Sequence, residues 1–236
     1  MDEELLPDMA ILDPSLVVTA PPSVTADTGF DVITHALEAY VSTNASDASD
    51  ALAEKALELA FEYLPKAYKD GNDLTAREKM HSASCLAGMA FNAVSLGVNH
   101  GIAHQLGAKF HIPHGRANAM LLPYVIEFNA DVAGHFGEAD SEAAMRYAKV
   151  AGRIGLPCNN VRTGVKALID ELSYMLDMMK VPRTLSAAGV KEADYNAVKS
   201  DILRAAVADP CTATNPRLVD EEKVELILNK MLGWSL

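Results

Sequence analysis

Apolar residues recur at steps of three and four from Thr28 to near the end of the chain. In the first such segment the apolar positions are Phe30, Ile33, Leu37 and Tyr40 with Val41. This spacing places them on one face of an α-helix. The next segment repeats the pattern at Leu52, Ala56, Leu59 and Ala60. The period predicts helices almost without interruption.

Capping and helix-breaking residues divide this pattern into elements. Ser46 and Ser49 are candidate N-caps, Pro65 should bend or end the second helix, and residues 70–72 (Asp-Gly-Asn) form a loop. Pro113 should start a helix that Pro123 kinks. Further helices are expected at residues 75–94, between Gly97 and Gly107, and at 141–154, 160–180, 191–208 and 220–233.

Only the first 25 residues indicate extended structure. Short apolar runs at 9–12 and 16–18 alternate there with Asp13-Pro14 and Pro21-Pro22. Such a segment is too brief to make a sheet, because an isolated pair of strands is marginal in water. We therefore predict an all-α protein, with a short extended lead-in (residues 1–25) and a single domain of about eight helices (residues 26–236).

Composition narrows the classes of function. Half of the residues are hydrophobic and 22% are charged, as in a folded globular protein. A formal net charge of −12 argues against a nucleic-acid partner, because affinity for phosphate backbones comes from lysine and arginine. No apolar run is long enough for a membrane span, and the acidic N-terminus does not resemble a secretory signal.

The cysteines indicate a reducing compartment. Cys85, Cys158 and Cys211 are odd in number, far apart and without C-x-x-C spacing. They suggest neither a disulfide framework nor a thiolate metal site. We expect a cytoplasmic protein.

Candidate chemistry lies in two pairs of residues spaced four apart on helices. Asp31 and His35 project from one helix face, as do His100 and His104, and His114 follows across an expected loop. One carboxylate and two or three imidazoles can converge on a divalent cation. Spacing alone leaves other roles open: Asp31 could belong to a helix cap with Thr28, and the histidines could be hydrogen-bonded core residues.

Three longer motifs resemble a known family. They are T-G-F-D-V-I-T-H-A-L-E-A-Y (28–40), G-V-N-H-G-I-A-H-Q-L-G (97–107) and F-H-I-P-H-G-R-A-N-A-M-L-L-P (110–123). With D-P-C-T-A-T-N-P-R at 209–217, they closely resemble the iron-containing (group III) alcohol dehydrogenases, from about Met9 to the end of the chain. The resemblance implies the dehydroquinate synthase-like helical C-terminal domain of that family.

The resemblance also implies roles for individual residues. The family's four metal ligands correspond to Asp31, His35, His100 and His114. His104 matches an active-site histidine near the nicotinamide, with a proton relay and a supporting hydrogen bond as alternative roles.

Five further residues carry weaker expectations. Phe91 and Cys211 match residues that line the substrate pocket, with simple packing as the alternative. His81, His111 and His135 are interpreted as structural or surface residues.

The activity implied by the resemblance is reversible oxidation of a primary alcohol to an aldehyde with NAD(P). The metal would act as a Lewis acid on the alcohol oxygen, hydride would pass to the nicotinamide, and His104 could help move the proton. Fe(II) is implied by the family, although nitrogen and oxygen ligands also suit Zn, Co or Ni. Partners would be a small alcohol or aldehyde and, at full length, further copies in a homodimer or higher oligomer.

The family's cofactor domain has no counterpart here. The sequence contains no G-x-G-x-x-G, no G-G-G-S and no series of βα units, and Met9–Pro14 resembles the last strand of that domain. We therefore expect the C-terminal, metal-binding half of a longer enzyme, inactive without an N-terminal dinucleotide-binding domain. The alternatives are a non-catalytic helical metal-binding or assembly module, and half of a glycerol dehydrogenase-like zinc enzyme.

Overall fold

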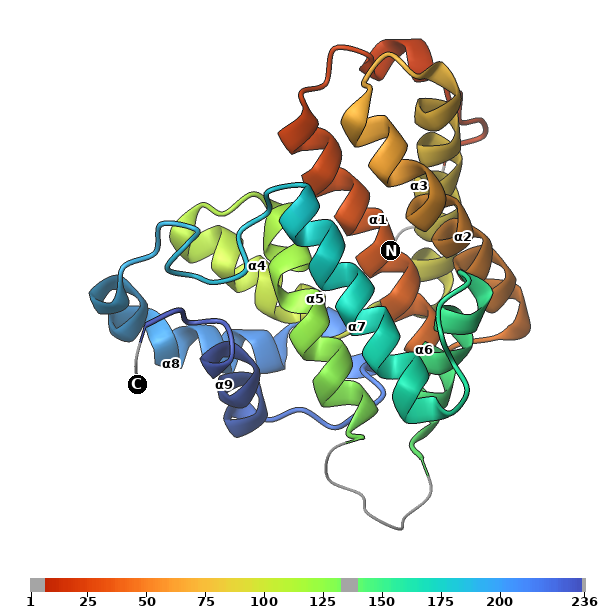
Figure 1. The fold of residues 1–236 in the computed structure, drawn as a ribbon. Coiled ribbons are helices and arrows are strands. Elements are labelled where there is room, and N and C mark those ends of the chain that lie inside the picture. The colour runs from red at the N-terminus through yellow and green to blue at the C-terminus, as the bar shows by residue number, and fades with distance from the viewer. Residues whose placement is uncertain (1–6, 133–139, 235–236) are drawn as a thin grey trace.

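Helices make up nearly all of the computed structural model, which describes residues 7–132 and 140–234 (Figure 1). Within those ranges there are nine α-helices, two short 3-10 helices and no strand. The α-helices are α1 (Pro22–Val41), α2 (Asp47–Lys69), α3 (Leu74–Val94), α4 (Val98–Phe110), α5 (His114–Ala130), α6 (Glu142–Arg153), α7 (Val161–Met178), α8 (Glu192–Ala208) and α9 (Glu221–Asn229); the 3-10 helices are η2 (Pro14–Val17) and η3 (Pro210–Thr214). The predicted all-α class is confirmed, with one helix more than the expected eight.

Most helix boundaries follow the capping residues. Ser46 caps α2 by accepting a hydrogen bond from the Ser49 backbone N–H, and the Ser49 side chain accepts one from the Ser46 backbone N–H. Helix α1 starts at Pro22, six residues before the expected Thr28, because a proline at the first helical position needs no hydrogen-bond acceptor for its nitrogen. Pro65 does not end α2, which continues for one more turn to Lys69.

The lead-in departs from the expected extended segment at residues 14–17 and from residue 22 onward. Residues 14–17 form the 3-10 helix η2, which Asp13 caps by accepting a hydrogen bond from the Ser15 backbone N–H. Within the described residues there is no strand for this segment to pair with.

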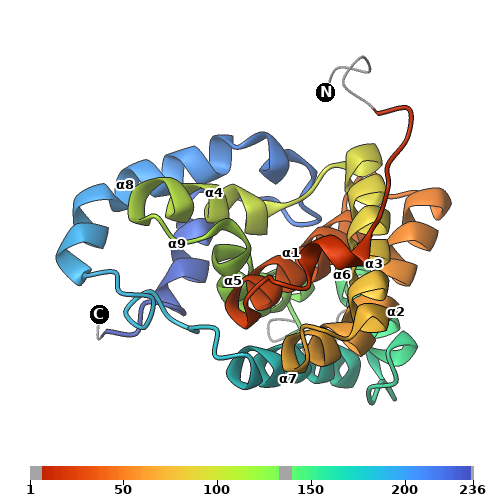
Figure 2. The same ribbon diagram turned by 90° about the horizontal axis from the view of Figure 1, so that it is seen from above.

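Helices α1 and α5 pack against each other in the middle of the molecule. Helix α1 also contacts α2 and α3, whereas α5 contacts α4, α7 and α9 (Figure 2). Most side chains of α1 are therefore buried, among them Phe30, Ile33 and Leu37 at 1% exposure or less. A polar side chain on the buried faces of α1 and α5 needs hydrogen-bond partners inside the protein. Among the described helices, none is long and apolar enough to cross a membrane.

Candidate metal centre

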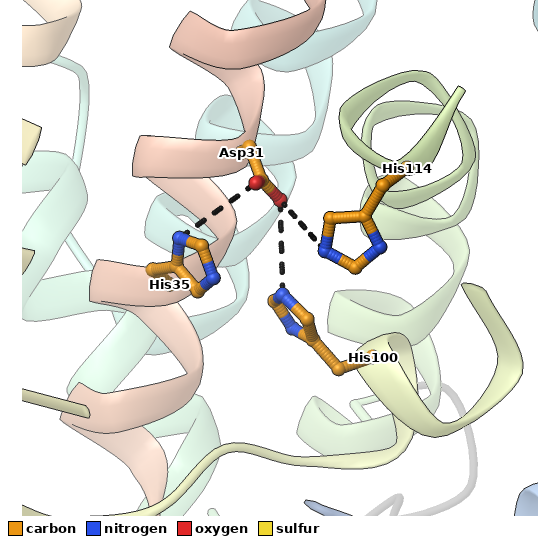
Figure 3. A group of neighbouring side chains, drawn as sticks. All are labelled: Asp31, His35, His100 and His114. Atoms are coloured by element: carbon orange, nitrogen blue, oxygen red, sulfur yellow. Dashed lines mark ion pairs between the residues drawn. The ribbon is translucent and has the colours of Figure 1, made fainter. Parts of the chain in front are cut away.

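Asp31 and His35 lie one turn apart near the middle of α1 and face the starts of α4 and α5 (Figure 3). Asp31 lies nine residues after the helix start at Pro22, too far along to serve as a cap, and the Thr28 hydroxyl instead donates to the Val24 carbonyl. The capping role considered for Asp31 is therefore wrong.

His100 on α4 and His114 at the first position of α5 complete a cluster around the Asp31 carboxylate. Asp31 Oδ1 lies 3.7 Å from His100 Nε2 and 3.6 Å from His114 Nε2, and Asp31 Oδ2 lies 4.0 Å from His35 Nδ1. One potential ligand atom from each of the four side chains lies within 4.8 Å of the other three. The three distances from Asp31, 3.6 to 4.0 Å, suit donors around one ion, because bonds of about 2 Å place two donors at most about 4 Å apart.

The start of α5 reaches α1 because residue 115 is glycine. A Cβ at Gly115 would lie 2.2 Å from the Asp27 carbonyl oxygen, so any side chain there would push the two helices apart. The next residue, Arg116, pairs with the Asp27 carboxylate through Nε at 3.1 Å and Nη2 at 3.0 Å. This two-pronged contact fixes the helix start that carries His114.

Burial and carboxylates compete to set the charges in the cluster. Burial lowers the pKa of His35 to about 4, against the opposing effect of Asp31. Burial also opposes protonation of His100, but the carboxylates of Glu38 and Asp31 outweigh it and raise the pKa to about 9. Burial likewise lowers the pKa of His114. For Asp31, burial is outweighed by the surrounding histidines, which lower the pKa of its carboxyl group.

A second group lies beside the cluster and contains His104, Asp209 and Cys211. His104 Nδ1 is 2.8 Å from Asp209 Oδ2, and the Cys211 backbone N–H donates to Asp209 Oδ1 at 2.9 Å. The His104 ring stacks on that of His114 at a centroid distance of 5.4 Å. Burial, with Asp209 nearby, raises the pKa of the Cys211 thiol to about 12, so this side chain is a neutral thiol.

A second close approach between segments, at Gly101, brings this group next to the cluster. A Cβ at Gly101, between His100 and His104, would lie 2.2 Å from the Thr212 hydroxyl of η3. Glycine at this position therefore lets η3 lie directly against α4.

The remaining expected site residues lie in different surroundings. Phe91 stacks on the His35 ring at a centroid distance of 4.6 Å, so it borders the cluster. His111 is exposed, ends α4 in a left-handed conformation with a φ of 56° and belongs to neither group. His81 lies on α3, outside both groups, and His135 lies outside the described residues.

Three residues at the site had no role in the sequence prediction, although their positions carried a signal. Glu38 follows Asp31 by seven residues and so lies on the same face of α1. Asn118 follows His114 by four residues on α5. Asp209 is two residues before Cys211. In each case the helical period or the proximity to a chosen residue pointed to the site.

Comparison with known proteins assigns the family. The sequence profile of the Fe-containing alcohol dehydrogenase family, C-terminal, matches residues 25–232. The chain belongs to this family. Among its relatives, the 1-propanol dehydrogenase PduQ of Citrobacter freundii is 47% identical over 230 residues. The bifunctional aldehyde-alcohol dehydrogenase AdhE of Escherichia coli K12 is 43% identical over 244 residues.

The structures agree with this assignment. An iron-containing alcohol dehydrogenase from Thermococcus thioreducens superposes with a TM-score of 0.85 at 34% identity, over 98% of this chain and 56% of that one. The alignments cover 97% and 98% of this chain but only 60% of the propanol dehydrogenase and 27% of the bifunctional enzyme. The chain thus spans little more than half of the iron-containing alcohol dehydrogenases that it matches, or less.

Proposed function

We propose that this chain is the metal-binding part of an alcohol dehydrogenase that interconverts primary alcohols and aldehydes with NAD(P). The observation that carries the proposal is the convergence of Asp31, His35, His100 and His114, from three helices, in a chain of this family. The relatives named as 1-propanol and aldehyde-alcohol dehydrogenases support short primary alcohols as the substrate class.

The donors in the cluster fit a divalent cation. One carboxylate and three imidazoles leave a divalent ion with a formal charge of about +1, which favours an additional anionic or polar oxygen. Fe(II) is the metal we propose from the family, and the same donors accept Zn, Co or Ni. A cation held there would act as a Lewis acid that lowers the pKa of an alcohol oxygen.

The other side chains of the site would orient the substrate and move its proton. His104 lies beside His114 with Nδ1 bonded to Asp209, which leaves Nε2 to exchange a proton with an alcohol hydroxyl or with solvent. Phe91 would pack against the carbon chain of the substrate from the His35 side. The neutral thiol of Cys211 would serve as a small apolar surface.

The hydride would pass between the carbinol carbon and a nicotinamide. We propose that a dinucleotide-binding domain of the whole protein holds the NAD(P), as the resemblance implies, and that the whole protein forms a homodimer or higher oligomer. Closure of such a domain over His104 and His114 would exclude water from the reacting atoms.

Metal analysis tests the proposed centre. Protein purified without chelator should contain about one equivalent of divalent metal, whereas His100→Ala and His114→Ala should each retain less than about a tenth of it. His104→Ala is the matched control and should keep the metal, because His104 belongs to the other group. Unchanged metal content in both ligand variants would refute the assignment.

Activity tests the remainder of the proposal. In the whole protein, reduction of NAD or NADP should depend on a short primary alcohol and should be lost with the metal in His100→Ala. A metal-replete whole protein with no alcohol-dependent reduction would instead indicate a non-catalytic metal-binding module.

A further inference from the structure

Glu38 is a carboxylate buried behind the metal centre. Its side chain is 3% exposed, and it lies on α1 on the same face as Asp31. One oxygen, Oε2, bonds to His100 Nδ1, and the other, Oε1, accepts a hydrogen bond from the Asn99 backbone N–H at 2.8 Å. Both oxygens therefore act as acceptors toward the start of α4.

The buried side-chain amides of Asn99 and Asn118 extend this hydrogen bonding to the Asp31 side of the cluster. Asn99 Nδ2 donates to Asn118 Oδ1 at 2.9 Å and to the Asn118 backbone carbonyl at 3.2 Å. Asn118 Nδ2 in turn donates to Asp31 Oδ1 at 2.7 Å. Both asparagines are 0% exposed. Glu38, Asn99 and Asn118, which we call the buried polar network, thus connect His100 to Asp31.

The orientation of each amide in the network follows from its neighbours. If Asn118 were turned by 180°, its carbonyl oxygen would face the Asp31 carboxylate and its NH2 would face that of Asn99. If Asn99 were turned, its oxygen would face two acceptor oxygens of Asn118. The observed arrangement matches donors with acceptors along the connection from Glu38 to Asp31. The same Asn118 Nδ2 also lies 3.0 Å from His100 Nε2 and 3.1 Å from His114 Nε2.

The network determines which atom of His100 faces the cluster. Because both oxygens of Glu38 act as acceptors, the contact keeps a hydrogen on Nδ1 whether the ring is neutral or protonated. The atom left to exchange a proton for a cation is Nε2, which lies 3.7 Å from Asp31 Oδ1. A histidine whose other nitrogen is bonded to a carboxylate is also a more basic metal ligand.

We propose that Glu38 is a positioning residue for the divalent cation: it fixes the Nδ1–H tautomer of His100, while Asn99 and Asn118 tie the same carboxylate to the Asp31 side of the site. The inference rests on the proposed metal centre. Glu38 does not contact the cation itself, and its effect is exerted through the direction of the His100 lone pair.

Glu38→Gln tests the proposal with little change of shape. A glutamine has one acceptor oxygen, whereas the Asn99 N–H and the His100 Nδ1–H need two. If the amide oxygen accepts from Asn99, its NH2 faces Nδ1 and moves the imidazole hydrogen to Nε2, where the cation would bind. The affinity of the 236-residue chain for Zn²⁺ or Co²⁺, measured by competition with a chelator, should fall about 10- to 100-fold.

Glu54→Gln provides the matched control. Glu54 on α2 accepts a hydrogen bond from the Tyr40 hydroxyl at 2.8 Å and pairs with Lys149 at 3.0 Å, and none of its partners is a proposed ligand. This variant makes the same chemical change in another partly buried network, so its metal affinity should equal that of the wild type. Circular dichroism melts on both variants check that each is folded.

A measurement on the wild type keeps the proposal testable if Glu38→Gln does not fold. Nitrogen-15 NMR of histidine-labelled, Zn²⁺-loaded chain should show His100 with a hydrogen on Nδ1 that exchanges slowly with water, and with the metal on Nε2. Metal on Nδ1, or a hydrogen on Nε2, would overturn the proposal. Equal metal affinities of the wild type and a folded Glu38→Gln variant would overturn only the role of Glu38. A wild type that binds no cation would overturn both the metal centre and this inference.

Discussion

The two sides of the candidate centre differ in how they hold their histidines. On the buried side, His100 and Glu38 have side chains 1% and 3% exposed and are connected to Asp31 through the hydrogen bonds of Asn99 and Asn118. On the open side, the side chains of His114 and His104 are 45% and 40% exposed, and Gly115 and Gly101 let the neighbouring segments approach closely beside them. One side is therefore suited to holding an ion in a fixed geometry, and the other to admitting reactants.

Gly115→Ala should disrupt the open side most strongly. The new methyl group would lie 2.2 Å from a backbone oxygen of α1, which cannot rotate away as a side chain would. We expect the free energy of unfolding to fall by about 3 kcal/mol, near the upper end for overpacking. Affinity for Zn²⁺ should fall as well, because His114 moves away from Asp31. Urea denaturation and chelator competition measure the two effects.

Gly88→Ala is the control for that substitution. Gly88 lies within α3, and a Cβ there meets nothing within 4 Å. Alanine should stabilise the protein by about 0.5–1 kcal/mol through helix propensity and should leave metal affinity unchanged. Equal unfolding free energies for the two variants would show that close approach at Gly115 is unimportant.

The pH dependence of the free energy of unfolding tests the charge of His100 on the buried side. In metal-free protein the pKa of His100 rises from 6.5 to about 9, so its folded form binds a proton more tightly than its unfolded form. That stabilisation is fully present below pH 6.5 and is lost as pH rises through 9, by about 3 kcal/mol. His35 and His114, whose pKa values are lowered, act in the opposite direction and below pH 6.5.

His100→Gln isolates this effect. Urea unfolding of metal-free protein at pH 6.5 and at pH 9 should show the decrease in the wild type and little of it in the variant. A wild type equally stable at both values would contradict the assigned charge of His100 in the metal-free protein.

Asp209→Asn should produce the smallest effect and confine it to the open side. The asparagine oxygen can still accept from the Cys211 backbone N–H, which leaves an NH2 group facing His104 Nδ1. We expect a change in the His104 tautomer, visible by nitrogen-15 NMR, with a stability change below about 1 kcal/mol and no change in metal affinity. A loss of metal comparable to that of Glu38→Gln would show that the two sides are not independent.

The sequence predicted the helices well where it carried its own capping signals. The Ser46 cap is an example, and the spacing of Asp31 and His35 correctly placed both side chains on one face of α1. The start of α1 was misplaced because Pro21-Pro22 suits both a turn and a helix N-terminus, and only packing against the rest of the protein selects the helix.

The hydrogen bonds that hold the proposed ligands could not be predicted from the sequence. Glu38 contacts His100 across 62 positions of the chain, and no local pattern specifies such a contact. The convergence of α1, α4 and α5 likewise depends on glycines that are informative only when their spatial neighbours are known, as at Gly115. The family motifs pointed to the four proposed ligands, whereas the surroundings that set their charges required the structure.

Anomalous diffraction from crystals of the chain containing Zn²⁺ or Co²⁺ tests the central claim most directly. We expect one strong peak within bonding distance of Asp31, His35, His100 and His114, about 2.0–2.2 Å from each donor atom. A peak at His104, Asp209 and Cys211 instead, or no peak in either group, would contradict it.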